Sequence, residues 1–485
     1  KPLNQEACLP IEPAVLSLRR HPMIKRLART ILLVGLTIPL ASFGQQSVLN
    51  YLYTDFNEGK QQQTITTIMN GGMSPDAQAE LAYAEAETLM IKRNSQPSPS
   101  NDQAAGQWLA NAAMLDIHAG RPDQGLLFLS EALELLDAQG TPFAPELFKA
   151  VMARGISAFQ LSDFDQAKDD FQWGQNILHR NDGVLTFSQA ETVNWLTRVY
   201  LAKRELFNAD TQQRFLLKVA EAHYDENHPM LISIKQNVAE YLGQRAALIS
   251  PLENEPTRAI RQAMFTESLT LLETLIGTLE QTAGSTSIKL IDPLRSLVRI
   301  RQMQGTAYRL TEAPLQRVLD ILMAQETVDD EDLANAWLEL GDGMVLSGNP
   351  KSSNAYQMAW SLLASSSPDA LAQFDEPMLL NPKKITPLIL ERRPSRAPPD
   401  AELYADMTMM VNERGRTKGV KITERTVSAK FSRWARSRLS YSRFRPAMAE
   451  GAPVAKSVQL RQPFTVVSEI DGGNSSTTSI PDDND

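Results

Sequence analysis

Side chains that commonly carry catalysis or hold metals are few in this sequence, and they lack the spacings that such sites need. The histidines are His21, His118, His179, His223 and His228. The last two stand five positions apart, so they do not share a helix face as the ligands of a zinc site would. Cys8 is the single cysteine, which excludes a disulfide within the chain and a cysteine-based metal site. We expect the histidines at the surface or at junctions between repeats.

The other chemical motifs also point away from an enzyme. The sequence has no Gly-Lys-Ser/Thr phosphate loop and no Gly-x-Ser-x-Gly elbow. The acidic run at residues 329–332 could attract a cation, but acidic residues also stabilise a helix N-terminus, and we interpret the run as a solvated cap. The sequence therefore predicts a non-enzymatic protein with no catalytic residue, metal or cofactor. A cell-wall enzyme is an alternative, and it predicts a pocket of converging carboxylates.

Charge is distributed unevenly along the chain. The whole chain carries −9, whereas residues 382–470 hold 18 Lys and Arg against 8 Asp and Glu. This division predicts an acidic body and a basic C-terminal module with separate surfaces. Aromatic residues lie among the basic ones between Arg425 and Arg445, as in nucleic-acid binders. Export, which the N-terminus predicts, argues against nucleic acid and leaves anionic lipid or cell-wall polymer as contacts.

The N-terminal region has the order of an export signal. A basic cluster follows Met23, an uncharged apolar run extends from Thr30 to Gly44, and small residues stand at −3 and −1 before Gln45. This order predicts a signal peptide at about residues 23–44 and a periplasmic location, with residues 1–22 ahead of the signal. The apolar run is shorter than the roughly 20 residues that a membrane span needs. An uncleaved inner-membrane anchor is the alternative.

Small residues recur every 42 positions. One series is Ala113, Gly155, Thr197 and Ala239, and a second is Gly125, Ala167 and Ala209. Small side chains at such positions let the two helices of a pair approach closely, while Leu129 and Phe171 are expected to fill the groove between pairs. The period predicts stacked helical pairs over residues 104–250, and it fails at Pro251.

Helical patterns flank this array on both sides. Residues 45–103 form a lead-in, with an amphipathic helix at 75–93 and a loop at 96–103. Residues 251–381 predict further helical pairs, among them a repeat-like unit at 333–364 that opens with Trp337 and Gly341. The apolar stripe of the first of these helices is Leu269, Leu272, Leu275, Ile276 and Leu279.

The repeat pattern resembles tetratricopeptide repeats of the 42-residue, kinesin-light-chain-like kind. His228-Pro229 followed by Asn237-Val-Ala239-Glu-Tyr241 is similar to the junction between repeats in that group, and Trp337-x2-Leu-Gly341 is similar to a repeat opening. The resemblance implies a mostly α fold, an α-solenoid whose concave surface holds a protein partner.

A change of period marks the C-terminal module. Residues 382–400 are rich in proline and arginine and predict a semi-rigid linker. Beyond it, alternating apolar residues predict a strand over Leu403–Val411, a turn at Gly415 and a second strand at 417–423. A helix at 426–442 and a last strand through Val458 complete a β-β-α-β domain with an antiparallel sheet at 401–467. Residues 468–485 predict a disordered tail.

This module resembles the C-terminal domain of TonB. The residues that carry the resemblance are Arg443, Phe444, Arg445, Pro446, Ala447, Gly451, Pro453 and Phe464. The resemblance implies that an exposed edge strand captures an extended peptide of an outer-membrane transporter by strand addition. Carried to this chain, the edge is residues 457–466, with Gln459, Arg461 and Thr465 facing outward and Pro463 removing one donor.

The departures from that family concern energy transduction. No Tyr-Pro precedes the first strand, no long Pro/Lys spacer is present, and the apolar N-terminal run lacks a Ser/His face. The sequence therefore predicts an exported adaptor that docks envelope proteins through a helical array and a TonB-like module. A membrane-anchored TonB-family component of envelope transport is the alternative.

Overall fold

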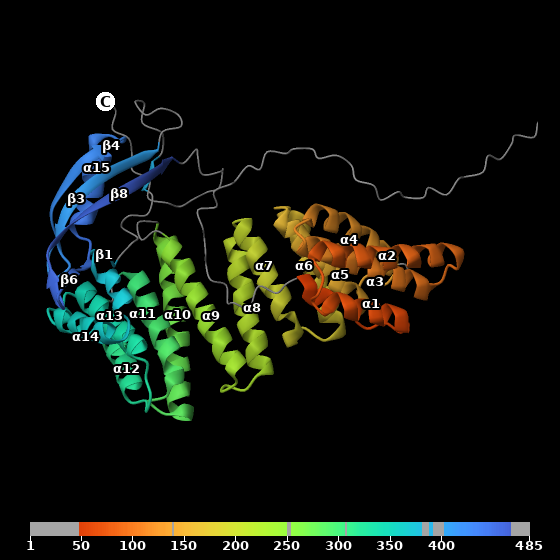
Figure 1. The fold of residues 1–485 in the computed structure, drawn as a ribbon, viewed down its shortest axis with the longest axis horizontal. Coiled ribbons are helices and arrows are strands. Elements are labelled where there is room, and N and C mark those ends of the chain that lie inside the picture. Colours follow the sequence, from red (N-terminus) through yellow and green to blue (C-terminus); the bar gives the residue numbers. More distant parts are fainter. Residues whose placement is uncertain are drawn as a thin grey trace, which may run out of the picture. The chain divides into compact units, whose positions relative to one another are not determined.

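The computed structural model describes residues 48–137, 140–249, 254–305, 308–380, 388–390 and 402–466. The predicted signal peptide, most of the predicted linker and the predicted tail lie outside these residues. The described chain is mostly helical and ends in a small sheet with one helix (Figure 1). The helical part is a tetratricopeptide-like α-solenoid, as the repeat pattern predicts.

Consecutive helices pack against each other along the array (Figure 1). The first four pairs are α1 (Gly59–Met69) with α2 (Pro75–Ser95), α3 (Pro99–His118) with α4 (Pro122–Leu136), α5 (Phe148–Gln160) with α6 (Phe164–Asn181), and α7 (Ala190–Ala202) with α8 (Leu206–His223). The later pairs are α9 (Pro229–Leu248) with α10 (Glu255–Ala283), α11 (Ile291–Gln304) with α12 (Glu312–Met323), and α13 (Asp330–Ser347) with α14 (Ser352–Ser366).

The 42-residue step of the sequence is visible in the helix starts. Helix α5 begins at Phe148 and α7 at Ala190, and their partners α6 and α8 begin at Phe164 and Leu206. Short 3₁₀ turns precede the first helix of these pairs, η2 at Pro145–Leu147 and η3 at Phe187–Gln189. Turns, helices and buried small residues therefore repeat together.

The loop expected at residues 96–103 is shorter than predicted. The hydroxyl of Ser98 accepts a hydrogen bond from the backbone N–H of Asn101, and Pro99 occupies the first position of α3. A serine cap followed by proline is a favourable helix start, because the cap satisfies a free N–H and proline has none to lose. Helix α3 therefore begins inside the predicted loop.

The C-terminal sheet has the strand order β2-β8-β3-β4. Strands β3 (Leu403–Val411), β4 (Thr417–Arg425) and β8 (Lys456–Val466) are antiparallel, and helix α15 (Ala429–Ser440) packs against β3 and β4. Alternate residues of β3 are buried on one face, where they form a core with Phe431, Leu439 and Phe464. The β-β-α-β order predicted from the sequence is present.

Short strands complete the module. Strand β1 (Met378–Leu379) pairs with β5 (Phe444–Arg445), and β6 (Ala447–Ala449) forms a hairpin with β7 (Ala452–Val454). Strand β2 (Leu388–Leu390) pairs with the end of β8 in the parallel direction. The prediction of a plain linker at 382–400 is thus wrong for these three apolar residues, because the end of β8 offers them a strand edge.

Candidate protein-interaction surfaces

The predicted repeat anchors lie where helices approach each other most closely. Ala113, Ala167, Thr197, Ala209 and Ala239 have no exposed surface, and Gly125 and Gly155 are also buried. A methyl group added to Gly155 would stand 2.7 Å from the Phe171 ring on α6. The Gly125 position likewise faces Ile117 and the carbonyl of Ala113 on α3. These positions are small because the paired helix occupies the space of a side chain.

The last repeat-like unit is built in the same way. A methyl group on Gly341 would stand 2.6 Å from the Tyr356 ring on α14, and Trp337 is half-buried against the core of this pair. The Tyr356 hydroxyl donates to Asp342 Oδ1 at 2.9 Å. Burial raises the pKa of Tyr356, and the Asp342 carboxylate raises it further. Asp342 is therefore held on the face of α13 that meets the C-terminal module.

The residues that carry the TonB resemblance join the module to the array. Arg445 is 7% exposed, and its Nη2 and Nε atoms lie 2.7 and 3.0 Å from the two carboxylate oxygens of Asp342. Gly451, with φ of +78°, lies against the Trp360 ring on α14. Met448 is buried in the core of the α13–α14 pair.

Other members of this set hold the module together. Phe444 is fully buried and its N–H donates to the carbonyl of Gly415, while Phe464 packs near Phe431 with ring centroids 6.4 Å apart. Pro446 and Ala447 are buried, Pro453 is half-buried opposite Met448, and Arg443 is half-buried. Burial and the nearby Arg416 lower the pKa of Arg443.

The charge division predicts that the array and the module have separate surfaces. In the structure the two parts are instead in direct contact. Lys456 at the start of β8 donates to the carbonyl of Asp375 at 2.7 Å and pairs with Glu376 at 2.8 Å. Together with the buried Arg445–Asp342 pair, this contact places basic residues of the module on acidic residues of the array. The basic residues of the module and the acidic residues of the array therefore bind each other and connect the two parts.

The predicted peptide-binding edge is β8. On one side its residues Lys456–Phe464 pair with β3, and on the other the described residues pair with it only at Phe464–Val466. The Tyr404 N–H and C=O both bond to Thr426, so the pair Tyr404–Pro463 is not hydrogen-bonded. Backbone groups alternate along a strand, so those of Ser457, Gln459 and Arg461 point to the open side.

The three outward residues predicted on this strand differ in their surroundings. Gln459 is exposed, opposite Thr408. Arg461 lies on the outer face of the sheet, where Asp406 binds Nε and Nη2 at 2.9 Å and the Tyr404 ring lies 3.8 Å away. Thr465 is already paired with Ile389 of β2. Among the described residues, the edge predicted at 457–466 is therefore covered only at Phe464–Val466, where β2 pairs with it.

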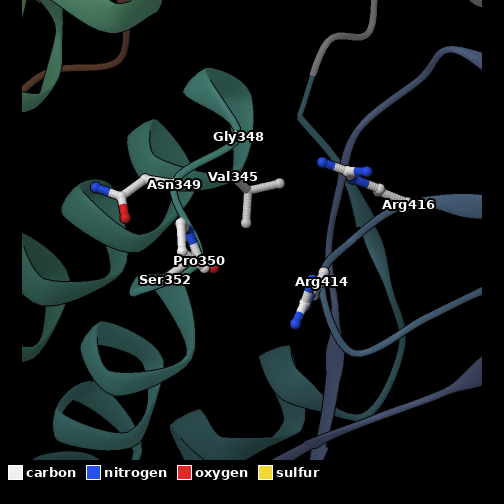
Figure 2. Close-up of a pocket in the computed structure, with 7 residues that line it drawn as sticks. All are labelled: Val345, Gly348, Asn349, Pro350, Ser352, Arg414 and Arg416. Atoms are coloured by element: carbon white, nitrogen blue, oxygen red, sulfur yellow. The ribbon is translucent and has the colours of Figure 1, made fainter.

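A hollow lies between the array and the β3–β4 turn. It is lined by Val345, Gly348, Asn349, Pro350, Ser352, Arg414 and Arg416. Figure 2 shows the two arginines on the side of the β3–β4 turn and the other residues on the side of α13 and α14. These guanidinium groups can attract an anion. The lining includes no carboxylate, histidine or cysteine, so it offers no such general base or nucleophile.

The remaining candidate residues have structural surroundings. His228 caps α9 through Nδ1, which accepts from the N–H of Met230, and Asp329 caps α13 by accepting from the N–H of Glu331. His179 Nε2 lies 2.5 Å from Gln189 Oε1, whereas His118 and His223 are exposed. Across the described ranges, His, Cys, Asp and Glu side chains form no group of three that could hold a metal ion.

Two polar residues outside the predicted set also make specific contacts. Asp342 is one, and Asn111 on α3 is another, because its fully buried side chain bonds to the backbone of Tyr53. A polar residue inside the apolar run from Leu109 to Leu115 is the signal that could have identified Asn111. No helix of the described residues is long and apolar enough to cross a membrane.

Part of the chain is similar in fold to solved arrays of kinesin-light-chain type. A Podosopora anserina array of nearly identical TPR-like repeats is 14% identical, with a TM-score of 0.36, over 48% of this chain and 100% of that array. A substituted form of the same array is 13% identical, with a TM-score of 0.34, over 44% and 92%. BtubC (BKLC) from P. vanneervenii is 14% identical, with a TM-score of 0.25, over 60% and 92%.

No family model matches the chain, and no curated protein matches it. The resemblance of the C-terminal module to the TonB C-terminal domain stays a prediction.

Proposed function

We propose that this protein is a non-enzymatic adaptor of the periplasm that holds one envelope protein on its helical array and an extended peptide on strand β8. The observation that carries the proposal is the side of β8 that no described residue pairs with before Phe464, called here the open side. Backbone groups of Ser457, Gln459 and Arg461 face it, and the sheet is fixed to the array by the buried Arg445–Asp342 pair. A strand added there is held at a constant position relative to a partner bound on the array.

The chemistry of this edge favours recognition through the main chain. An added strand gains hydrogen bonds from the outward backbone groups, and the side chain of Gln459 is free to distinguish sequences. Pro463 supplies no N–H, so pairing weakens toward the end that β2 covers. The TonB resemblance supports a peptide of an outer-membrane transporter as the occupant.

The experiment that tests the edge compares Gln459→Pro with Gln459→Ala. Proline removes an outward N–H without removing a bond to β3, whereas alanine changes only the side chain. A photocrosslinker at Ser457 in the full-length protein should give the same crosslinked envelope protein in the wild type and in Gln459→Ala, and lose it in Gln459→Pro. Equal crosslinking in all three proteins would refute strand addition. A crosslinker at Lys421, on the opposite edge strand, is the positional control.

Location requires its own measurement. Export with cleavage predicts a soluble periplasmic chain that begins at Gln45. The anchored alternative predicts a chain in the membrane fraction that retains the apolar run from Thr30 to Gly44. Cell fractionation with N-terminal sequencing separates the two, and a chain that stays in the cytoplasm would contradict both.

A further inference from the structure

A short stretch of the chain ahead of α1 lies across helices of three successive pairs. Residues 48–56 begin as the 3₁₀ turn η1 (Val48–Tyr51) and continue without helix or strand. The turn contacts α3 and α5, and the Tyr51 side chain reaches the vicinity of Glu191 on α7. Burial raises the pKa of Tyr51, and the Glu191 carboxylate raises it further. We call residues 48–56 the N-terminal segment.

The main chain of this segment is bound by side chains of the array. Asn111 on α3 accepts from the Tyr53 N–H at 2.7 Å and donates to the Tyr53 carbonyl at 2.8 Å. Lys149 on α5 donates to the carbonyl of Leu52 at 2.9 Å. These hydrogen bonds are made to backbone atoms, which every extended peptide has. They therefore bind an extended main chain without selecting one particular sequence.

Aromatic side chains give the segment its selectivity. Phe56 stacks on Trp108 of α3 with ring centroids 4.9 Å apart, and Tyr51 meets the edge of Phe148 at 6.3 Å. The Tyr53 hydroxyl donates to the carbonyl of Glu146 at 2.5 Å. Tyr51 and Tyr53 are 4% and 7% exposed, so the array encloses them almost completely.

The array does not depend on this segment for its own stacking. Helices α3, α4 and α5 contact each other directly, with the small residues Gly125 and Gly155 at the close approaches. The side chain of Asn111, by contrast, bonds within the described chain only to the Tyr53 backbone. The segment leaves the array through exposed Asn57 and Glu58 before α1 begins. It therefore has the contacts of a bound peptide with an exposed connection.

We propose that α3, α5 and α7 form a binding groove for an extended peptide with aromatic residues, and that the N-terminal segment occupies it as an intramolecular ligand. A partner gains this groove by replacing the segment with one of its own of the same chemistry. Only the replacement of the N-terminal segment by a partner rests on the proposed adaptor function. Occupation of the groove by the segment itself is independent of any partner.

The test uses the full chain with a site-specific protease site in place of Asn57 and Glu58. Cleavage turns the tethered segment into a free peptide while the array is already folded. We expect the peptide to remain bound at high concentration and to dissociate on dilution. The array should stay helical by circular dichroism and then bind a fluorescein-labelled peptide of residues 48–57 in a saturable way. The uncleaved chain should not bind that peptide.

Two variants connect the result to the contacts. Asn111→Asp keeps the shape and the acceptor but loses the donor to Tyr53, and we expect it to weaken binding of the labelled peptide by about 10-fold or more. Asn208→Ala, at an exposed position on α8, is the matched control and should bind as the wild type does.

Two outcomes overturn the inference. If the array unfolds when the peptide leaves, the segment is a part of the core rather than a ligand. If the folded array fails to rebind the peptide, or Asn111→Asp binds it unchanged, the groove is not a peptide site. Both readouts use only this chain, so they remain informative even where the β8 experiment finds no partner.

Discussion

Arg445 on β5 and Asp342 on α13 are 103 residues apart in the sequence and form a two-point contact between the C-terminal module and the array. Both side chains are largely buried, at 9% and 17% exposure. Removing one partner of such a pair leaves a charge without compensation in a place that water reaches poorly, at a cost of about 3–5 kcal/mol.

Arg445→Ala should therefore lower the free energy of unfolding by about 3 kcal/mol. Denaturant unfolding followed by circular dichroism measures the change. Arg214→Ala is the control, because the side chains of Arg214 and its partner Glu267 are 41% and 36% exposed and such a pair contributes about 1 kcal/mol or less. Equal losses in the two variants would show that Arg445–Asp342 does not join the module to the array.

Gly155 provides a test of helix packing within a repeat. A methyl group there would stand 2.7 Å from Phe171, so Gly155→Ala must separate α5 from α6 and should cost about 1–3 kcal/mol. Gly277 on α10 has nothing within 4 Å of the same added atom. Gly277→Ala should instead stabilise by about 0.5–1 kcal/mol, because alanine favours a helix. Thermal unfolding of both variants measures these changes in stability. A gain in stability for Gly155→Ala would contradict the close approach of α5 and α6 at this position.

Gly415, in the turn between β3 and β4, and Gly419, within β4, offer a second matched pair. Gly415 and Gly419 have φ of +67° and +63°, so alanine costs about 1 kcal/mol in backbone strain at either position. Only at Gly415 does the added atom also collide with the carbonyl of Phe444. We expect Gly415→Ala to be the more destabilising variant by at least about 1 kcal/mol in denaturant unfolding. Equal effects would mean that the turn moves away without cost.

Glu191 on α7 predicts a pH dependence. Its burial raises the pKa of the carboxyl above the ordinary 4.5, although the polar groups of Tyr51 and Trp195 and the charge of Arg198 oppose the shift. A raised pKa means that the folded state holds the proton longer than the unfolded state. Stability is therefore lost as pH rises from the ordinary pKa through the folded one.

Glu191→Gln removes this titration. Relative to the wild type, the variant should gain stability on going from pH 4 to pH 7, measured by denaturant unfolding across that range. A stability difference that stays constant with pH would show that burial of Glu191 has no consequence for its ionisation.

The sequence predicts local and periodic features of this fold well. The small residues at Gly155 and Ala167 repeat because each helical pair has the same steric requirement, and the strand Leu403–Val411 alternates because one face is buried. Such requirements depend on a residue and its near neighbours. They therefore produce a periodic pattern of residue types that can be recognised in the sequence.

Contacts between segments that are distant in the sequence leave no such periodic pattern. The Arg445–Asp342 pair depends on the placement of β5 beside α13, and the pairing of β2 with β8 depends on an edge that exists only after folding. The N-terminal segment has no period at all, since its residues are fixed by Asn111, Lys149 and Trp108 of the array. Net charge misleads for the same reason, because opposite charges that suggest separate parts here attract each other.

The covalent connection of the N-terminal segment to α1 sets a threshold for any competitor. A short tether holds its own ligand at an effective concentration of about millimolar. A free peptide at micromolar concentration must then bind about 1,000-fold more tightly than the segment does to displace it from half of the molecules. A partner that also engages β8 gains the same advantage by being tethered itself. The groove would thus respond to partners that are already assembled at the other end of the protein, and ignore isolated peptides of similar sequence.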